Sequence, residues 1–216
     1  MKKLLLVFLF ITFNLFAQEI DGTQMSQVFN VEGVSASELH SRINTAIANI
    51  FNSAKDVIQL NDPQNKKFIV KGVANVPVEN VYKAMHPKNP YIPSIYDYDH
   101  PMALNIASRD GRYKVTLKYS RGTVVLTNGT IQENTLDPLM DFTEEYVSSQ
   151  VEVQKQEFNR PEYKMDFTVG KKKKQALLDA IPKSLYAYRD GLINYGTQLF
   201  VRIYDEVNSP SDSDDW

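Results

Sequence analysis

The stretch 28–51, VFNVEGVSASELHSRINTAIANIF, decides the fold of this 216-residue chain. Its first four residues predict a short strand, and Gly33 suits a tight turn into a helix. Ser35 and Glu38 fit a capping box, in which the serine hydroxyl and the glutamate carboxylate each accept a free backbone N–H at the helix start. The stretch therefore predicts a strand followed by a capped helix.

The helix predicted over residues 35–51 has one apolar face. Apolar side chains recur at steps of three and four residues, at Leu39, Ile43, Ala46, Ile47 and Ile50. The opposite face, expected in solvent, carries His40, Ser41, Asn44, Thr45 and Asn49. Because such a helix needs a layer to cover its apolar face, the downstream segments are expected to form a sheet.

Downstream segments alternate in the manner of strands. The predicted strands are residues 56–60, 67–73, 102–107, 113–119 and 122–127. The turn-forming sequence NDPQN at 61–65 joins the first two as a hairpin. Asp110-Gly111 joins the next pair, and this dipeptide favours a type I′ turn, which needs positive φ at both central residues.

Residues 113–119 show the alternation most clearly. Tyr113, Val115, Leu117 and Tyr119 share one face, and Lys114, Thr116 and Lys118 share the other. One buried and one wet face is typical of an antiparallel sheet that is covered on a single side. The predicted fold class is therefore α+β, with a mainly antiparallel sheet and helices on one face.

Residues 74–101 interrupt this pattern with a proline- and tyrosine-rich insertion. It contains Pro77, Pro87, Pro90, Pro93 and Pro101, together with Tyr82, Tyr91, Tyr96 and Tyr98. Prolines at this density exclude a regular helix and remove donors from a strand ladder. We expect a long ordered loop between strands, and loops of this length are often functional.

The chain from residue 128 to 206 is expected to be a helical extension that completes the domain. Asp137-Pro138 suits a helix start, because proline is favoured in the first turn. A later helical stretch contains Pro182, which should kink or restart it, so that the long helix covers residues 183–205.

Both ends of the chain are predicted to lie outside the folded domain. Residues 1–17 have the features of a signal peptide, since Lys2 and Lys3 precede an apolar run and Ala17 suits cleavage before Gln18. An uncleaved anchor is the alternative, although the run is shorter than the ~20 residues that span a bilayer. Residues 18–27 are expected to be a loose leader and 207–216 a disordered acidic tail.

Composition limits the functional classes. The absence of cysteine excludes disulfides, thiolate catalysis, zinc–thiolate sites and a bacterial lipoprotein anchor. The formal charge is −2, and it falls to −4 when Lys2 and Lys3 are removed. A mildly acidic chain without a long basic face makes a poor nucleic-acid binder. Together with the predicted signal peptide and the absence of a second apolar run of spanning length, this leads us to expect a periplasmic or secreted mature protein with no nucleic-acid partner, no cofactor and no transmembrane span.

These residues resemble a bacterial family of unknown function with a TATA-binding-protein-like fold. The resemblance covers about residues 28–119 and rests on the strand and helix entry at 29–39, the run 51–60, Gly72 and the hairpin at 110–113. It implies a β-α-β-β-β-β-α arrangement in envelope proteins, and it implies no activity. The insertion at 74–101 and the helical C-terminus depart from the family pattern.

The most reactive-looking residues lie together in the sequence YDYDH at 96–100. Carboxylates beside a histidine could perform acid–base chemistry or hold a divalent ion, so one hypothesis is an envelope hydrolase or metal-binding protein that uses Asp97, Asp99 and His100. Tyrosines in a proline-rich loop more often pack on the core or form a contact surface. We therefore expect no catalytic, cofactor or metal site, but a possible interaction surface at Tyr91, Tyr96, Asp97, Tyr98, Asp99 and His100.

Other candidate groups have simpler explanations. The three histidines, His40, His86 and His100, lack the spacing of metal ligands and are expected to be solvated surface residues. The lysines at 171–174 could touch anionic lipid, but a solvated helix start more often explains such a run. The sequence favours a non-catalytic binding or protein-interaction module whose partner is an unknown envelope protein or cell-surface component.

Overall fold

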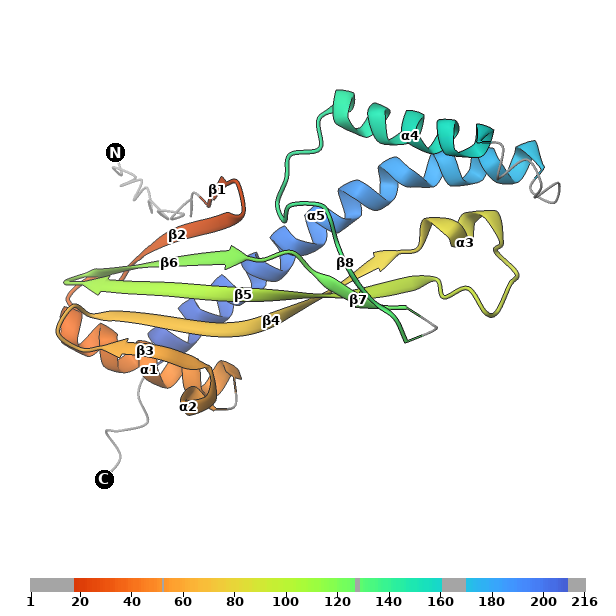
Figure 1. The fold of residues 1–216 in the computed structure, drawn as a ribbon. Helices are drawn as coiled ribbons and strands as arrows, with labels where there is room; N and C mark the ends of the chain where they lie inside the picture. The colour runs from red at the N-terminus through yellow and green to blue at the C-terminus, as the bar shows by residue number, and fades with distance from the viewer. Residues whose placement is uncertain (1–17, 52, 127–128, 161–169, 210–216) are drawn as a thin grey trace, which may run out of the picture.

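A computed structural model describes residues 18–51, 53–126, 129–160 and 170–209. Within these residues an antiparallel sheet of eight strands forms the centre of the molecule (Figure 1). The strands are β1 (Glu19–Asp21), β2 (Gln24–Asn30), β3 (Ile58–Asp62), β4 (Lys67–Glu79), β5 (Ile95–Arg109), β6 (Arg112–Tyr119), β7 (Thr123–Val125) and β8 (Ile131–Glu133). Their order is β1-β2-β6-β5-β4-β3, and β7 pairs with both β5 and β8.

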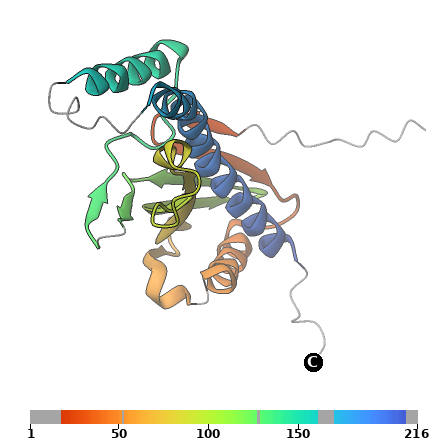
Figure 2. The same ribbon diagram turned by 90° about the vertical axis from the view of Figure 1, so that its right-hand side faces the viewer.

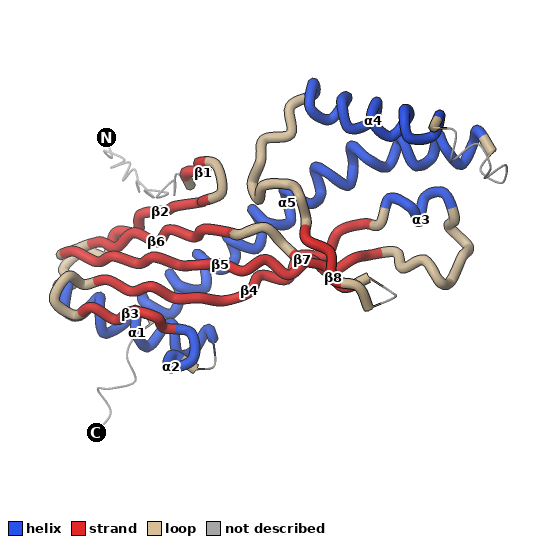
Figure 3. The backbone as a smooth tube through the Cα atoms, in the orientation of Figure 1, coloured by secondary structure: helices blue, strands red, loops and turns tan. Residues whose placement is uncertain are grey.

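The helices are arranged mainly on one side of this sheet. They are α1 (Ala36–Phe51), α2 (Ala54–Val57), α3 (Val81–Met85), α4 (Glu144–Asn159) and α5 (Lys171–Asn208). α1 and α5 pack against each other and against the same face of the sheet, as Figure 2 shows from the end. α4 packs on α5, and α3 lies at the far end of β4 and β5 (Figure 3). The predicted α+β class, with an antiparallel sheet and helices on one face, is confirmed.

The start of α1 has two side-chain caps. As predicted, the Ser35 hydroxyl accepts the N–H of Glu38 over 3.2 Å. The Glu38 carboxylate does not complete the capping box, because it accepts hydrogen bonds from Arg42 one turn later. The second cap comes from a distant strand turn, where Asp110 Oδ1 accepts the N–H of Ala36 over 2.7 Å. The β5–β6 hairpin is thereby joined to the helix start.

The turn of that hairpin lies where the sequence predicts it but has a different geometry. Gly111 has a φ of 72°, whereas Asp110 does not have a positive φ, so the turn is not type I′. Contacts with residues 31–34 fix it: the Gly111 N–H donates to Val34 O over 2.9 Å, and its carbonyl accepts from Val31 N over 2.8 Å. The hairpin turn is therefore hydrogen-bonded on both sides of Gly111 to the chain before α1.

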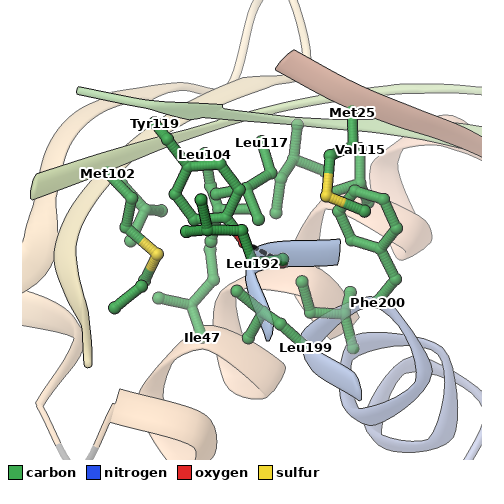
Figure 4. Packing of buried hydrophobic residues seen from close by; sticks show 14 of the residues in the cluster. Met25, Ile47, Met102, Leu104, Val115, Leu117, Tyr119, Leu192, Leu199 and Phe200 are labelled. Carbon is green, nitrogen blue, oxygen red and sulfur yellow. Dashed lines mark hydrogen bonds between the residues drawn. The ribbon is translucent and has the colours of Figure 1, made fainter. Parts of the chain in front are cut away.

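The hydrophobic core fills the space between the sheet and the helices α1 and α5 (Figure 4). The predicted apolar face of α1 is buried at Leu39, Ile43, Ala46 and Ile47. The predicted apolar face of β6 is buried as well, at Tyr113, Val115, Leu117 and Tyr119. α5 contributes Leu192, Leu199, Phe200 and Ile203. The apolar side chains that recur every three to four residues on the helices and every second residue on the strand thus form one core.

The insertion at 74–101 differs from the expected long loop. β4 continues to Glu79 and β5 begins at Ile95, so the two strands form a long arm that is closed by α3 and a short loop. Proline is tolerated where its nitrogen needs no ladder partner. Pro77 lies beyond the pairing of β4 with β3, and Pro101 lies between the pairings of β5 with β6 and with β7.

Residues 18–27 also differ from the expected loose leader. β1 pairs with β2 as a hairpin, and β1 forms one edge of the sheet. Gly22 takes a φ of 58° in the turn between them. Met25, inside this segment, is fully buried beneath the sheet. Its burial explains why a polar-looking segment is ordered.

The C-terminal half corrects two expectations. β8 and an irregular segment precede α4, which begins after Thr143, whose hydroxyl accepts the Tyr146 N–H, and not at Asp137-Pro138. α5 passes through Pro182 as one 38-residue helix. Proline removes a single helical hydrogen bond there, while Leu177 and Tyr188 remain buried on either side of it. Nearer the N-terminus, residues 56 and 57, predicted as the start of a strand, lie in α2, and β3 begins at Ile58.

The predicted signal peptide, residues 1–17, lies outside the described residues. The same holds for residues 210–216 of the predicted tail.

Candidate functional site

The sheet has one covered and one open face. α1 and α5 cover the first, and the opposite face is free of α1, α4 and α5 (Figure 2). We call this opposite side the open face. Along β4, β5 and β6 its side chains are exposed or half-exposed, while the intervening side chains are buried beneath the helices. The open face is therefore an accessible surface whose residues are positioned by strand register.

Three rungs of directly paired residues cross β4, β5 and β6 on the open face. The rungs are Lys67–Ala107–Lys114, Ile69–Asn105–Thr116 and Lys71–Ala103–Lys118. Paired residues of antiparallel strands share a face, so two lysines stand on each side of a floor of small residues on β5. We call these nine residues the lysine trough.

Surface hollows follow the trough toward the β5–β6 hairpin. One, of about 500 Å³, is lined by Lys67, Asn105 and Lys114 among others. A second, of about 300 Å³, shares Ala107 and Lys114 with the first and is lined further on by the two arginines that flank the turn at positions 109 and 112. The open face is thus hollowed and cationic over the same residues.

The four lysines of the trough are not neutralised by ion pairs. The ion pairs among the described residues involve other cations. An acidic group at the border is Asp62 on β3, beside Lys67. Hydrogen bonds from Asn65 and Gln64 lower the pKa of Asp62, with a smaller contribution from Lys67. The trough is therefore a local cluster of four lysines on a face that also carries acidic side chains.

The predicted cluster on β5 is divided between the two sides of the sheet. Because side chains alternate along a strand, Asp97 and Asp99 are exposed on the open face, whereas the rings of Tyr98 and His100 lie against Tyr188 of α5. Asp99 accepts a hydrogen bond from the Asn75 amide over 3.0 Å. The strand thus keeps both carboxylates on the opposite side from the imidazole, and the hypothetical acid–base or metal site is not brought together.

The other members of the predicted interaction surface differ in exposure. Tyr91, in the loop after α3, is 87% exposed, and Tyr96 is half-buried on the arm. Tyr98 is half-buried, and burial raises the pKa of its hydroxyl. His100 is fully buried. The residues predicted as one surface are therefore not a continuous surface.

His100 belongs to a buried aromatic cluster. Its Nδ1 lies 3.1 Å from the Ser120 carbonyl, which suits the tautomer that donates from Nδ1. Its ring centroid is 5.5 Å from that of Tyr188 and 6.4 Å from that of Tyr119. Among the described residues, His100 Nε2 and the Tyr188 hydroxyl have no hydrogen-bond partner. Burial lowers the pKa of His100, so the imidazole is neutral at pH 7 and packs as a core ring.

His40 also departs from the expected solvent face. It is buried at the edge of α1, where Nε2 lies 2.8 Å from Asn61 Oδ1 and the ring stacks on Phe68 at 4.2 Å. The hairpin of β3 and β4 covers it, and no local sequence pattern predicts that contact. Only His86, which is half-buried, comes near to the expected solvation. In the described residues, no group of three or more His, Cys, Asp or Glu side chains is placed to hold a metal ion.

The lysine run that opens α5 is partly engaged within the protein. Lys174 Nζ lies 5.0 Å from the ring centroid of Phe158 on α4 and 3.4 Å from the Phe158 carbonyl. Across the described segments, no helix has both the length and the apolarity that crossing a membrane requires.

The sequence contains a signal for the trough that residue-by-residue inspection misses. Lys114 and Lys118 are predicted on the wet face of one strand, and Lys67 and Lys71 have the same spacing on another. Which strands are neighbours, and in which register, decides whether these pairs face each other. That information is absent from local periodicity.

Comparison with known proteins identifies the family and the fold of this domain. Residues 26–121 match the model of a family described as a domain of unknown function (DUF4468) with TBP-like fold. A TBP-like protein from Parabacteroides distasonis ATCC 8503 has a similar structure, with a TM-score of 0.51 and 8% identity over 88% of this chain and 97% of that one. A DUF4468 family protein from Bacteroides ovatus ATCC 8483 has a TM-score of 0.49 and 11% identity over 90% and 91%, respectively. No curated protein matches the sequence.

Proposed function

Residues 26–121 belong to this family of TBP-like domains of unknown function, and from that premise we propose that the chain is a non-catalytic interaction module of the bacterial envelope that binds through its open face. One observation carries the proposal: the helices cover a single face of the sheet, and the other face presents exposed, evenly spaced cations. Within the lysine trough the charged side chains are all lysines, and charged groups of one sign on an accessible surface attract a partner of the opposite sign.

Binding is favoured over chemistry by the positions of the reactive groups. Asp97 and Asp99 lie on the open face, and His100 is buried on the covered face. A general base must reach the group it deprotonates within hydrogen-bond distance, and these side chains share no such position. The buried imidazole therefore serves packing, while the exposed carboxylates remain available for contact.

Envelope location is supported by the sequence of the first seventeen residues, with Lys2 and Lys3 before an apolar run and Ala17 before Gln18. Expression of the full chain in a related bacterium, followed by cell fractionation and N-terminal sequencing, tests this part. We expect the protein in the periplasmic or secreted fraction, with Gln18 as its first residue. A cytoplasmic protein that retains Met1 would contradict the proposal.

Binding through the open face is tested by site-specific photo-crosslinking in the producing cell. A photoreactive residue replaces Asn105 on the floor of the trough, Tyr91 in the exposed loop, or Ser41 on the exposed side of α1. We expect a discrete adduct from position 105 and none from position 41, while position 91 tests the loop as an additional contact. Adducts from position 41 alone, or equal labelling at all three positions, would exclude the open face as the binding surface.

A further inference from the structure

We propose that the lysine trough binds an extended acidic segment of a partner protein, laid along β5. This inference rests on the proposed function, because it names the chemistry of the partner that the open face receives. Three features of the trough carry it: the spacing of its lysines, the small residues of its floor, and the apolar side chains between and beside its charges.

The lysine spacing matches the repeat of an extended peptide. Lys67 and Lys71 are four residues apart on β4, which is about 13 Å at the rise of a strand. Lys67 and Lys114 lie two strands apart, about 10 Å, with Ala107 between them. An extended segment has the same rise, so carboxylates at its positions i and i+4 reach successive pairs of lysines.

The floor of the trough leaves room for such a segment. Ala103 and Ala107 place only methyl groups between the lysines, and Asn105 lies between the two alanines on the same face. The Asn105 amide can both donate and accept, so it can bond the backbone of an incoming segment. A larger side chain at either alanine would fill the space between the lysine rows.

Apolar groups indicate that the partner is not simply a polyanion. Ile69 occupies the middle rung, Leu60 pairs with it from β3, and Val28 pairs with Lys114 from β2. Leu60 is 42% exposed and Val28 46% exposed. A segment with an apolar residue midway between two acidic residues places that residue on the middle rung. A protein segment can alternate acidic and apolar side chains in this way, whereas a simple polyanion cannot.

Other anionic partners fit these residues less well. Single-stranded nucleic acid is held mainly by stacking on aromatic side chains, and none of the nine trough residues is aromatic. Asp62 beside Lys67 repels any anion that lies over it: a segment with separated carboxylates can keep them away from Asp62, whereas the continuous phosphate surface of an anionic bilayer cannot. The structure therefore favours an acidic protein segment, and nucleic acid and lipid become outcomes of the test.

The experiment uses the mature chain and a labelled peptide of Glu-Ser-Val-Ser repeated three times. Its control peptide has the same composition with the three glutamates adjacent. Fluorescence anisotropy at low and physiological salt should show binding of the repeat peptide at least about tenfold tighter than the control, weakening with salt. A 20-residue oligothymidylate and vesicles containing phosphatidylglycerol serve as competing ligands.

Charge reversal locates the site. Lys67→Glu with Lys114→Glu should weaken peptide binding at least about tenfold, whereas Lys171→Glu with Lys173→Glu, in the exposed run of α5, should leave it unchanged. Circular dichroism checks that both variants fold. The wild-type chain alone can overturn the inference. It would do so by binding the two peptides equally, or by binding oligothymidylate or vesicles more tightly than the repeat peptide.

The two proposals fail in different ways. An adduct from position 105 without binding of the repeat peptide keeps the open face as the contact surface and rejects an acidic segment as its partner. Loss of both the adduct and the peptide binding rejects the open face itself.

Discussion

The Tyr119 hydroxyl on β6 donates a hydrogen bond to the Leu192 carbonyl of α5 over 2.8 Å, inside the core (Figure 4). Tyr119 is 1% exposed and Leu192 is completely buried. Burial raises the pKa of the Tyr119 hydroxyl, so it remains protonated and able to donate throughout the physiological range. This bond joins the family domain to the C-terminal helix, two parts of the chain separated by 73 residues.

Tyr119→Phe should lower the free energy of unfolding by about 1 kcal/mol or more, because it leaves a buried carbonyl without its side-chain donor. Urea unfolding followed by circular dichroism measures the change. Tyr113→Phe is the matched control, since the buried Tyr113 hydroxyl has no hydrogen-bond partner among the described residues. Its removal should be neutral or stabilising. Equal destabilisation by the two variants would mean that the Tyr119 bond contributes nothing specific.

Gly196→Ala should destabilise the protein, although alanine normally favours a helix. A Cβ at position 196 would lie 2.4 Å from Met25 Sδ and 3.0 Å from the Tyr119 hydroxyl oxygen, so the fully buried Met25 side chain, or the backbone of α5 or β2, must move. Overpacking of this kind costs about 1–3 kcal/mol. Gln198→Ala, on the exposed side of the same helix, should change the free energy of unfolding by less than about 0.5 kcal/mol. A stabilised Gly196→Ala variant would show that the Met25 side chain is not held tightly against α5.

Acidification should destabilise the protein through His100. Burial places its folded-state pKa below the ordinary value of 6.5, so the unfolded chain binds more protons as the pH falls through 6.5. The contribution of His100 to the free energy of unfolding is therefore fully present above about pH 6.5, and it decreases as the pH falls below that value. Urea unfolding at pH 7.5, 6.5 and 5.5 should show a larger loss for the wild type than for His100→Gln. Parallel losses in the two proteins would assign the pH dependence to other groups.

Asp110→Ala should weaken the start of α1. It removes the acceptor that the Ala36 N–H meets at 2.7 Å, and loss of a helix cap costs about 1 kcal/mol. Asp110→Asn retains an acceptor oxygen and should recover most of that loss. Thermal unfolding monitored at 222 nm compares the three proteins. If both variants lose the same stability, the carboxylate charge, and not the cap, is what matters at this turn.

Local sequence patterns predict the helices and strands of this fold well where one face of the helix or strand is buried and the other is exposed to solvent. The buried positions of α1 and β6 follow the predicted periodicities, and the turn at Gly111 lies where the sequence places it. Prediction fails where a distant segment supplies a partner. His40 is buried because β3 and β4 cover it, and Pro77 lies in a strand because the ladder there has a free edge.

The candidate site separates more clearly what local sequence predicts from what contacts between distant segments decide. The sequence by itself determines that Lys114 and Lys118 share one face of a strand, since side chains alternate with a period of two. Only the tertiary structure decided that Lys67 and Lys71 stand opposite them across Ala107 and Ala103. The physical reason is that strand order and register depend on backbone hydrogen bonds between distant segments and on the helices that cover one face, and a shift of one residue would turn these lysines away.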